Sequence, residues 1–205
     1  MLTVVGMGPA GLQWLIPAAR EAIAAAEALV GGSRHLQQFP DFAGERFALG
    51  ADMPALLAWI EARTGRRVVV LASGDPLFYG IGTRLIAHFG RERVQVIPGI
   101  SAVQYLCARA GIDMNDIWLT SSHGRAVSFD ALAAHRKVAM VTDGRCGPRE
   151  IAAQLMARGK GHRWMVIGEN LAMENERIHW LPVSAVEDEY EMNAVAVSYT
   201  HLTLP

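Results

Sequence analysis

The sequence predicts an α/β protein built from two α/β domains, with a mainly parallel first sheet, a mixed second sheet and a cleft between the domains. Through the first half, apolar runs without polar alternation are separated by segments of helical periodicity, which is typical of parallel strands joined by crossover helices. The last two apolar runs have no helix between them, which indicates an antiparallel element. A length of 205 residues suits one large domain or two small ones.

The first predicted domain covers residues 1–112. It opens with a short β-rich run into glycines, and Pro17 then starts a helix in the alanine-rich stretch "IPAAREAIAAAEALVGG". Asp52 is a plausible N-cap for the next helix, and Gly65 is a stop signal. The remaining elements alternate in order: a strand at 66–72, a helix at 80–90, a strand at 93–99 and a helix at 100–112.

The second predicted domain covers residues 117–197, after a polar turn at Asp113–Asp116 that we interpret as the interdomain connection. One helix is expected at 148–161. Strands are expected at 116–122, 137–144, 163–171, 177–186 and 192–198. Residues 198–205 follow the last convincing strand and are interpreted as a tail, a candidate for non-native sequence, so they are left out of the fold prediction.

Composition narrows the class of function. Lysine and arginine total 19 against 20 acidic residues, so no broad basic face is expected and no nucleic-acid partner is predicted. The first residues lack a basic signal-peptide region, and no apolar run is long enough to span a bilayer. Cys107 and Cys146 lie far apart and fit no metal spacing. They are predicted to be reduced thiols of a cytoplasmic protein, without a metal site.

Four predicted strands end in unusual loops, and these carry the functional argument. In open α/β sheets, ligands bind beyond the carboxyl ends of the strands. Each loop alone is weak evidence, and it is their joint occurrence after strands that matters. The loops are Gly6–Gly11, Ser73–Phe78, Pro98–Ala102 and Gly168–Leu171.

The first loop, "VVGMGPAG", literally satisfies the dinucleotide pattern G-x-G-x-x-G with Gly6, Gly8 and Gly11. Pro9 removes one amide donor from the phosphate cradle that this pattern requires. No acidic residue ends a second strand at the distance of a ribose partner, because Glu27 falls within the alanine-rich predicted helix. A dinucleotide site is therefore the less favoured interpretation.

The second loop, "SGDPLFYG", is more specific. Gly74 allows close approach of a ligand to the backbone, and Pro76 holds Asp75 in an extended conformation. We expect the Asp75 carboxylate to point outward, where it suits a ribose, amino or amide group. Phe78 and Tyr79 could form a wall for a flat ring. A simple helix-capping aspartate explains Asp75 alone, but not the whole string "ASGDPLFYGIG".

The other two loops are less specific by themselves. Ser101 lies near a helix start, where a capping role explains it without a ligand. Glu169 and Asn170 directly follow a predicted strand, where an ordinary solvated turn would also account for them.

Taken in order, the motifs "VGMGPAG", "ASGDPLFYGIG", "VIPGISAV", "SSHGR" and "IGENL" resemble those of the tetrapyrrole methylases. The segments "VGGSRHL" and "SSHGR" favour the subgroup that methylates C5 of a precorrin in cobalamin biosynthesis. The resemblance runs from about residue 2 to 197. It implies S-adenosylmethionine as methyl donor, S-adenosylhomocysteine as product, a donor cleft between two domains, and a homodimer.

The resemblance also implies the donor-site residues. Around Thr142, the segment "VTDGRCGP" departs from the family pattern, which has Asn and Thr or Ser before the proline. Ala10 stands where the family commonly has glycine, which puts only the turn shape in doubt. The predicted donor-site residues are Pro9, Ser73, Gly74, Asp75, Phe78, Ser101, Ala102, Thr142, Gly168, Glu169 and Asn170.

A precorrin carries many carboxylates, so its site needs a broad trough with a few cations. Arg34, His35, His123 and Arg125 are the candidates, because both pairs lie in subgroup-specific loops. Arginine binds carboxylates in a bidentate fork, and histidine donates or charges near neutrality. An isolated surface Arg-His pair is, however, usually only solvated. His123 is also the candidate acceptor for the proton that leaves after methyl transfer.

Three alternatives remain open from the sequence. The chain could be another methylase of the same fold that acts on uroporphyrinogen III or ribosomal RNA, or a nucleotide-binding module without catalysis. It could also be a fragment of a fusion, because the related two-activity protein continues into a C15-methyltransferase and decarboxylase. That second activity is then a fused domain or a separate partner.

Overall fold

The computed structural model describes residues 1–199, and the chain divides into two compact units, Met1–Ser101 and Ala102–Pro205. The division falls earlier than the predicted boundary at residue 112. The reason is that helix α5 (Ala102–Ala110) packs against strands β7 (Lys137–Val141) and β10 (Asn193–Ser198) of the second unit. The described part of the predicted tail begins inside β10, because Ser198 is that strand's last residue. Residues 200–205 lie outside the described residues.

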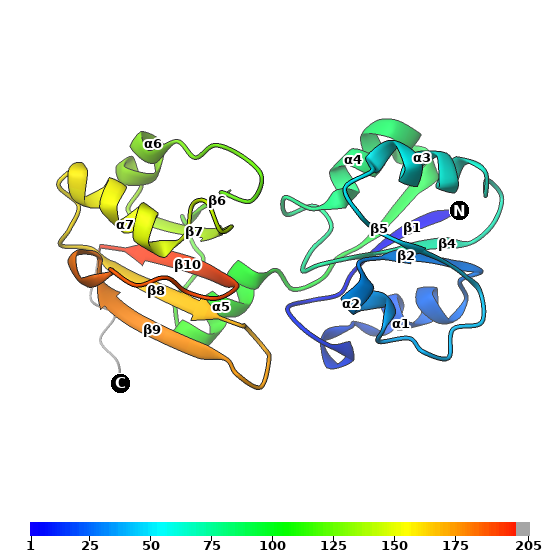
Figure 1. Ribbon diagram of the computed structural model, residues 1–205, viewed down its shortest axis with the longest axis horizontal. Helices are drawn as coiled ribbons and strands as arrows, with labels where there is room; N and C mark the ends of the chain where they lie inside the picture. The colour runs from blue at the N-terminus through cyan, green and yellow to red at the C-terminus, as the bar shows by residue number, and fades with distance from the viewer. Residues whose placement is uncertain (200–205) are drawn as a thin grey trace. The chain divides into compact units, whose positions relative to one another are not determined.

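The first unit contains a five-stranded parallel sheet in the order β3-β2-β4-β1-β5 (Figure 1). Its strands are β1 (Leu2–Gly6), β2 (Ala28–Gly31), β3 (Glu45–Ala48), β4 (Val68–Ala72) and β5 (Val94–Ile97). The predicted strands at 66–72 and 93–99 are confirmed. β1, β2 and β4 are buried throughout, as expected of strands covered on both faces.

Helices cover both faces of this sheet (Figure 1). Alternate strand residues such as Val4 and Val70 pack with α3 and α4, whereas Val5 and Leu71 face α1 and α2. The sheet therefore packs on both faces, through one apolar layer against α3 and α4 and another against α1 and α2. The helices are α1 (Pro17–Ala24), α2 (Ser33–Leu36), α3 (Met53–Glu61) and α4 (Ile81–Phe89).

Two of these helices show the expected end signals. Pro17 occupies the first turn of α1. The side chain of Asp52 caps α3 by accepting a 2.9 Å hydrogen bond from the amide of Ala55.

The prediction of one helix through the whole alanine-rich stretch is wrong. α1 ends at Ala24, and "ALVG" becomes strand β2 between β3 and β4. Leu29 and Val30 are fully buried on opposite faces of the sheet, so burial overrides the helix propensity of the preceding alanines. Strand β3 was not predicted either, because this short edge strand is largely exposed and has no apolar pattern.

The second unit contains a mixed sheet in the order β6-β7-β10-β8-β9, with β6 (Trp118–Ser121), β8 (Trp164–Glu169) and β9 (Arg177–Pro182). β6 and β7 are parallel, whereas β10 runs antiparallel to β7 and β8, and β9 antiparallel to β8. The predicted mixed sheet is confirmed. β9 and β10 do not pair with each other, since β8 lies between them.

Helices cover both faces of this second sheet as well (Figure 1). α6 (Phe129–Ala134) and α7 (Pro148–Ala157) pack on the face that carries Ile167. α5 packs on the other face, where a side chain added at Gly168 would meet Leu106. Of the helices in residues 1–199, none is long and apolar enough to cross a membrane.

Candidate active site

Three strand ends of the first unit meet at one point, immediately after β1, β4 and β5. A side chain at Gly99 would lie 2.3 Å from the carbonyl oxygen of Gly74, and one at Gly6 would lie 2.5 Å from Gly99. Both distances are shorter than any real contact, so only glycine fits at these two positions. The carboxyl edge of the sheet is therefore a tight junction of three loops.

The loops after β1 and β4 also exchange backbone hydrogen bonds. The amide of Gly8 donates to the carbonyl of Gly74 at 3.2 Å, and the amide of Gly74 donates back at 3.1 Å. This pairing uses an amide that a dinucleotide fingerprint would offer to phosphate. β4 also separates β1 from β2, whereas neighbouring first and second strands define the dinucleotide fold. The structure thus argues against the dinucleotide interpretation and brings Pro9, Ser73 and Gly74 into adjacent loops.

Asp75 has a different orientation from the one predicted. Its Oδ2 accepts a 3.1 Å hydrogen bond from the amide of Gly99, and its Oδ1 accepts a 2.8 Å bond from the amide of Leu77. The prediction of an outward-pointing carboxylate is wrong, because both oxygens turn back to the protein backbone. The side chain ties the loops after β4 and β5 together, and its remaining lone pairs are what it can offer a ligand.

Apolar and aromatic side chains are exposed in the same loop. Leu77 and Tyr79 are 51% and 44% exposed, and the rings of Phe78 and Tyr79 meet edge to face at 5.1 Å. Tyr79 has a φ of 52°, which is unfavourable for a residue with a side chain. Such strain is concentrated at binding sites, where the surrounding structure holds it in place. The loop therefore presents exposed apolar groups beside the strand end, where they could pack against a ligand.

The next two predicted donor residues stand where the chain passes from the first unit to the second. Ser101 is buried, with 8% exposure, and is the last residue of the first unit. Ala102 is the first residue of α5 in the second unit.

In the second unit, Glu169 ends β8 and is 6% exposed. Its Oε2 lies 2.6 Å from Nε2 of His179, and its Oε1 accepts a 2.8 Å hydrogen bond from the amide of Glu191. Burial by itself raises the pKa of Glu169, but the hydrogen bonds from His179 and Glu191 outweigh it and leave the pKa lowered. Glu169 is thus a buried carboxylate whose oxygens already bond to protein groups.

His179 and Glu191 were not singled out in the sequence. His179 pairs with Ile167 across the β8–β9 hairpin, and Glu191 precedes β10. No local motif marks either residue, because each reaches Glu169 only through strand pairing.

The turn after β8 is held by the residues that precede β10. Asn170 has a φ of 47°, its amide donates to the carbonyl of Met192 at 2.9 Å, and its side-chain amide donates to the Glu191 carboxylate. Thr142, at the end of β7, bonds through its hydroxyl to the backbone and side-chain oxygens of Asn193 at 2.9 and 2.6 Å. Thr142 and Asn170 therefore lie in loops that are both anchored to residues 191–193, which lead into β10.

The "SSHGR" loop is joined to the unusual "VTDGRCGP" loop by Asp143. Its Oδ2 accepts from the amide of Gly124 at 3.1 Å, and its Oδ1 accepts from the amides of Arg145 and Cys146 at 3.0 Å. These three backbone bonds lower the pKa of Asp143. The segment that departs from the family pattern next to Thr142 thus has a structural role in shaping two loops.

The four predicted substrate residues follow strand ends in both units. Arg34 is exposed and His35 half-buried in α2, which follows β2, while His123 and Arg125 are exposed after β6. Burial and the nearby Arg34 guanidinium lower the pKa of His35. Its imidazole is therefore neutral at neutral pH, where it can donate a hydrogen bond to a carboxylate but carries no charge.

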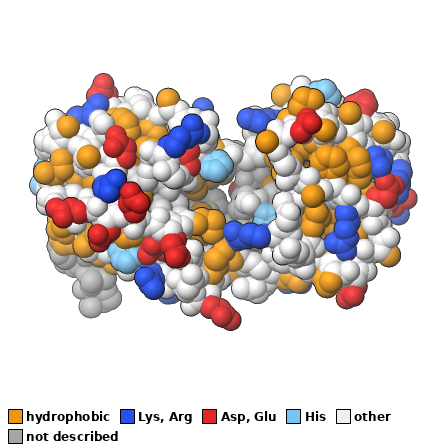
Figure 2. Space-filling model, in the orientation of Figure 1, with side chains coloured by type: hydrophobic (Ala, Val, Ile, Leu, Met, Phe, Trp, Pro, Cys, Tyr) orange, Lys and Arg blue, Asp and Glu red, His pale blue; other side chains and the backbone are white. Residues whose placement is uncertain are grey.

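Charged residues of both signs are interspersed on the face drawn in Figure 2, with no continuous basic stripe. Burial raises the pKa of the Cys107 thiol to about 11, which keeps that thiol protonated and unreactive. Among residues 1–199, no group of three or more His, Cys, Asp or Glu side chains could hold a metal ion.

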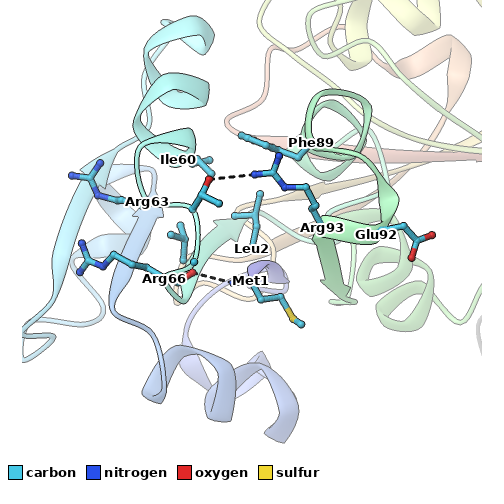
Figure 3. A pocket seen from close by; sticks show the side chains of 11 residues that line it. Met1, Leu2, Ile60, Arg63, Arg66, Phe89, Glu92 and Arg93 are labelled. Carbon is cyan, nitrogen blue, oxygen red and sulfur yellow. Dashed lines mark hydrogen bonds between the residues drawn. The ribbon is translucent and has the colours of Figure 1, made fainter.

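A cavity of about 250 Å³ lies elsewhere, at the amino end of the first sheet (Figure 3). Its floor is apolar, with Leu2, Ile60 and Phe89, and Arg93 spans it to donate to the hydroxyl of Thr64 at 3.3 Å. This edge is opposite to the one at which α/β sheets bind their ligands. The cavity therefore does not include any predicted site residue.

A family model described as Tetrapyrrole (Corrin/Porphyrin) Methylases matches residues 1–186. The chain therefore belongs to this family of methyltransferases.

Two relatives in this family are named as methyltransferases of precorrins. The chain is 77% identical over 197 residues to a cobalt-precorrin-7 C(5)-methyltransferase of Salmonella typhimurium, a match that covers 96% of this chain and 98% of that protein. It is 33% identical over 181 residues to a precorrin-6Y C(5,15)-methyltransferase (decarboxylating) of a Sinorhizobium species, covering 86% of this chain and 44% of that longer protein.

Solved structures share the fold. The precorrin-6Y methylase of Archaeoglobus fulgidus matches with a TM-score of 0.77 and 25% identity, over 98% of this chain and 99% of that one. A uroporphyrin-III C-methyltransferase of Thermus thermophilus, solved with S-adenosylhomocysteine, matches with a TM-score of 0.78 and 19% identity, over 96% of each chain.

Proposed function

We propose that this chain transfers a methyl group from S-adenosylmethionine to C5 of a cobalt-precorrin in the biosynthesis of cobalamin. The observation that carries the proposal is the 77% identity to a cobalt-precorrin-7 C(5)-methyltransferase over nearly the full length of both chains. The loops that follow β1, β4, β5, β6 and β8 support it, because each is held in a defined shape by the bonds described above. Methyltransferases of the family use S-adenosylmethionine as donor.

In the proposed donor site, the first unit contributes the junction of loops after β1, β4 and β5. The apolar Phe78 wall suits a flat base, while Asp75 and Ser73 offer polar groups beside it. The second unit contributes Thr142 and the turn after β8. The proposed donor-binding residues are Pro9, Ser73, Gly74, Asp75, Phe78, Ser101, Ala102, Thr142, Gly168, Glu169 and Asn170.

Methyl transfer is an in-line displacement. The ring carbon supplies the electron pair of the new carbon–carbon bond, and the sulfonium sulfur keeps the pair of the bond that breaks. Because the donor is already activated, positioning supplies most of the acceleration. The hydrogen on C5 then leaves as a proton, and we propose that His123 accepts it. Arg34, Arg125 and His35 would bind the carboxylates of the macrocycle.

Binding of S-adenosylhomocysteine tests the donor site. Calorimetric titration of the purified protein should show saturable binding of S-adenosylhomocysteine, with NAD and GTP as negative controls. Binding of NAD instead would revive the dinucleotide interpretation of "VVGMGPAG". A folded protein that binds none of the three would contradict the proposal of a preformed donor site.

The substrate requires a separate test. We expect transfer of labelled methyl groups from S-adenosylmethionine to a cobalt-precorrin, and none to uroporphyrinogen III or ribosomal RNA. Activity on either of these two would favour the other methylase activities of the fold. Donor binding without transfer to any tetrapyrrole would favour a non-catalytic nucleotide-binding module.

Assembly and partners complete the proposal. The Sinorhizobium relative is named for methylation at both C5 and C15, and this chain matches 44% of it. We propose that a separate or fused protein carries out C15 methylation and decarboxylation here. We also propose a homodimer in the cytoplasm, where free thiols such as Cys107 and Cys146 stay reduced. Light scattering of the purified protein measures the oligomeric state.

A further inference from the structure

The connection from β8 to β9 has an unusual backbone. Asn170 has a φ of 47° and Ala172 a φ of 63°, so two residues with side chains adopt the left-handed conformation within one short loop. Asparagine tolerates this region, whereas alanine is disfavoured there. The loop therefore needs external contacts to hold its shape.

Glu176 supplies those contacts on one side. Its carboxylate accepts hydrogen bonds from the amide of Ala172 at 2.7 Å, the hydroxyl of Tyr105 at 2.6 Å and Nε of Arg109 at 2.8 Å. Tyr105 and Arg109 are four residues apart on α5, so both point to the same side of that helix. The Glu176 side chain is 13% exposed. One carboxylate thus joins the strained loop to α5.

Side chains of the loop have little left to offer a ligand. Glu169 is engaged by His179 and the Glu191 amide, and the side-chain amide of Asn170 by the Glu191 carboxylate. The backbone amides of Asn170 and Ala172 and the carbonyl of Asn170 are also bonded to protein groups. What the turn can present is therefore chiefly the backbone of Leu171 and the carbonyl of Ala172, whose direction depends on the dihedral angles at Asn170 and Ala172. A small relaxation of the loop would therefore misdirect them.

We propose that Glu176 is a positioning residue for the methyl donor, which acts by holding the Asn170–Ala172 turn in its strained, binding-competent conformation. This inference rests on the proposed function, in which this turn is part of the donor site. Burial by itself raises the pKa of Glu176, but the bonds from Tyr105, Ala172 and Arg109 leave it lowered. The carboxylate is therefore ionised at neutral pH, as a three-fold acceptor should be.

Glu176→Gln is the main test, because an amide keeps the size of the side chain but replaces one acceptor oxygen by a donor group. We expect the Kd for S-adenosylhomocysteine to rise about tenfold, as expected for the loss of a hydrogen bond to a charged group. Tyr105→Phe removes one of the three donors to Glu176 and should raise the Kd for S-adenosylhomocysteine about threefold. The matched control is Glu174→Gln, an exposed glutamate of the same loop, which should leave the Kd unchanged.

Rescue distinguishes positioning from general support of the fold. Glycine adopts a φ of 63° without steric penalty, so Ala172→Gly in the Glu176→Gln background should recover most of the lost affinity. The KM for the tetrapyrrole should stay unchanged in Glu176→Gln while the KM for S-adenosylmethionine rises.

Each result decides the question. Wild-type affinity in Glu176→Gln, an equal loss of tetrapyrrole and donor affinity, or no rescue by Ala172→Gly would overturn the positioning role. If the wild-type protein itself fails to bind S-adenosylhomocysteine, the proposed function fails first, and the inference fails with it.

Discussion

Two strand-end loops, one in each unit, use an acidic residue for the same purpose in different ways. After β4, Asp75 accepts only backbone amides, those of Leu77 and Gly99, and remains partly exposed. At the end of β8, Glu169 is buried and bonds to both a backbone amide and the imidazole of His179. Both carboxylates shape a loop, but only the second also depends on a bond to another side chain.

An acidic residue in a binding loop is therefore not by itself a ligand contact. Asp75 was expected to face outward, and its two oxygens instead face the backbone. Loss of either carboxylate should therefore also act on the ligand through the shape of its loop. The loss of stability should be larger for Glu169 than for Asp75, because leaving a polar group unpaired in the interior lowers the free energy of unfolding more than leaving one unpaired near solvent.

The largest effect is expected for Glu169→Ala. This change leaves His179 and the amide of Glu191 without their buried acceptor, so the free energy of unfolding should fall by about 2–3 kcal/mol. Denaturant unfolding monitored by circular dichroism measures the loss. Glu187→Ala, at an exposed glutamate, is the matched control and should change stability by less than about 0.5 kcal/mol. A similar stability for both variants would show that the Glu169 contacts contribute little.

Asp75→Ala should have a smaller effect on stability and a clear one on the donor. Loss of two amide bonds near solvent should lower the free energy of unfolding by about 1 kcal/mol and raise the Kd for S-adenosylhomocysteine about tenfold. Asp52→Ala removes a similar bond, to the amide of Ala55, at the start of α3. It should cost about 1 kcal/mol as well but leave the Kd unchanged. Equal affinities of the two variants would remove Asp75 from the donor site.

The pH dependence of stability should separate the two carboxylates further. The pKa of Glu169 is lowered in the folded protein from its usual 4.5, so its stabilising contribution is present above that value. It is lost as the pH falls from 4.5 through the folded pKa. The difference in unfolding free energy between wild type and Glu169→Gln should therefore shrink as the pH is lowered from 7 to about 3. A difference that stays constant over this range would contradict the ionised role of Glu169.

The smallest expected effect is that of Arg125→Ala, which tests the substrate side. An exposed arginine that pairs with a substrate carboxylate contributes about 1 kcal/mol, so the KM for the tetrapyrrole should rise about fivefold. The Kd for S-adenosylhomocysteine should not change. Arg136→Ala, at an exposed arginine before β7 and thus at the opposite edge of the sheet, is the control. Weaker donor binding in Arg125→Ala would refute the division of roles.

Much of the architecture could be predicted from local patterns. A window of about ten residues is enough to predict several features. These are the apolar runs of β4 and β8, the capping aspartate of α3 and the glycine-rich strand ends. The strand β2 was missed because four apolar residues after an alanine-rich helix look the same whether they extend that helix or enter a sheet. Only pairing with β3 and β4 decides between the two.

The candidate site, too, could be predicted from local sequence only in part. The loops that carry it follow strands, so their common edge could be predicted from the α/β alternation. The partners of its carboxylates could not, because Gly99 lies 24 residues from Asp75, and His179 reaches Glu169 across a hairpin. The sequence by itself determined the fold class, the family and the edge of each sheet that bears the loops, since these depend on periodicity and short motifs. Only the tertiary structure decided where each carboxylate points. A carboxylate accepts a hydrogen bond from whichever donor the fold brings near it, irrespective of how far that donor lies along the chain.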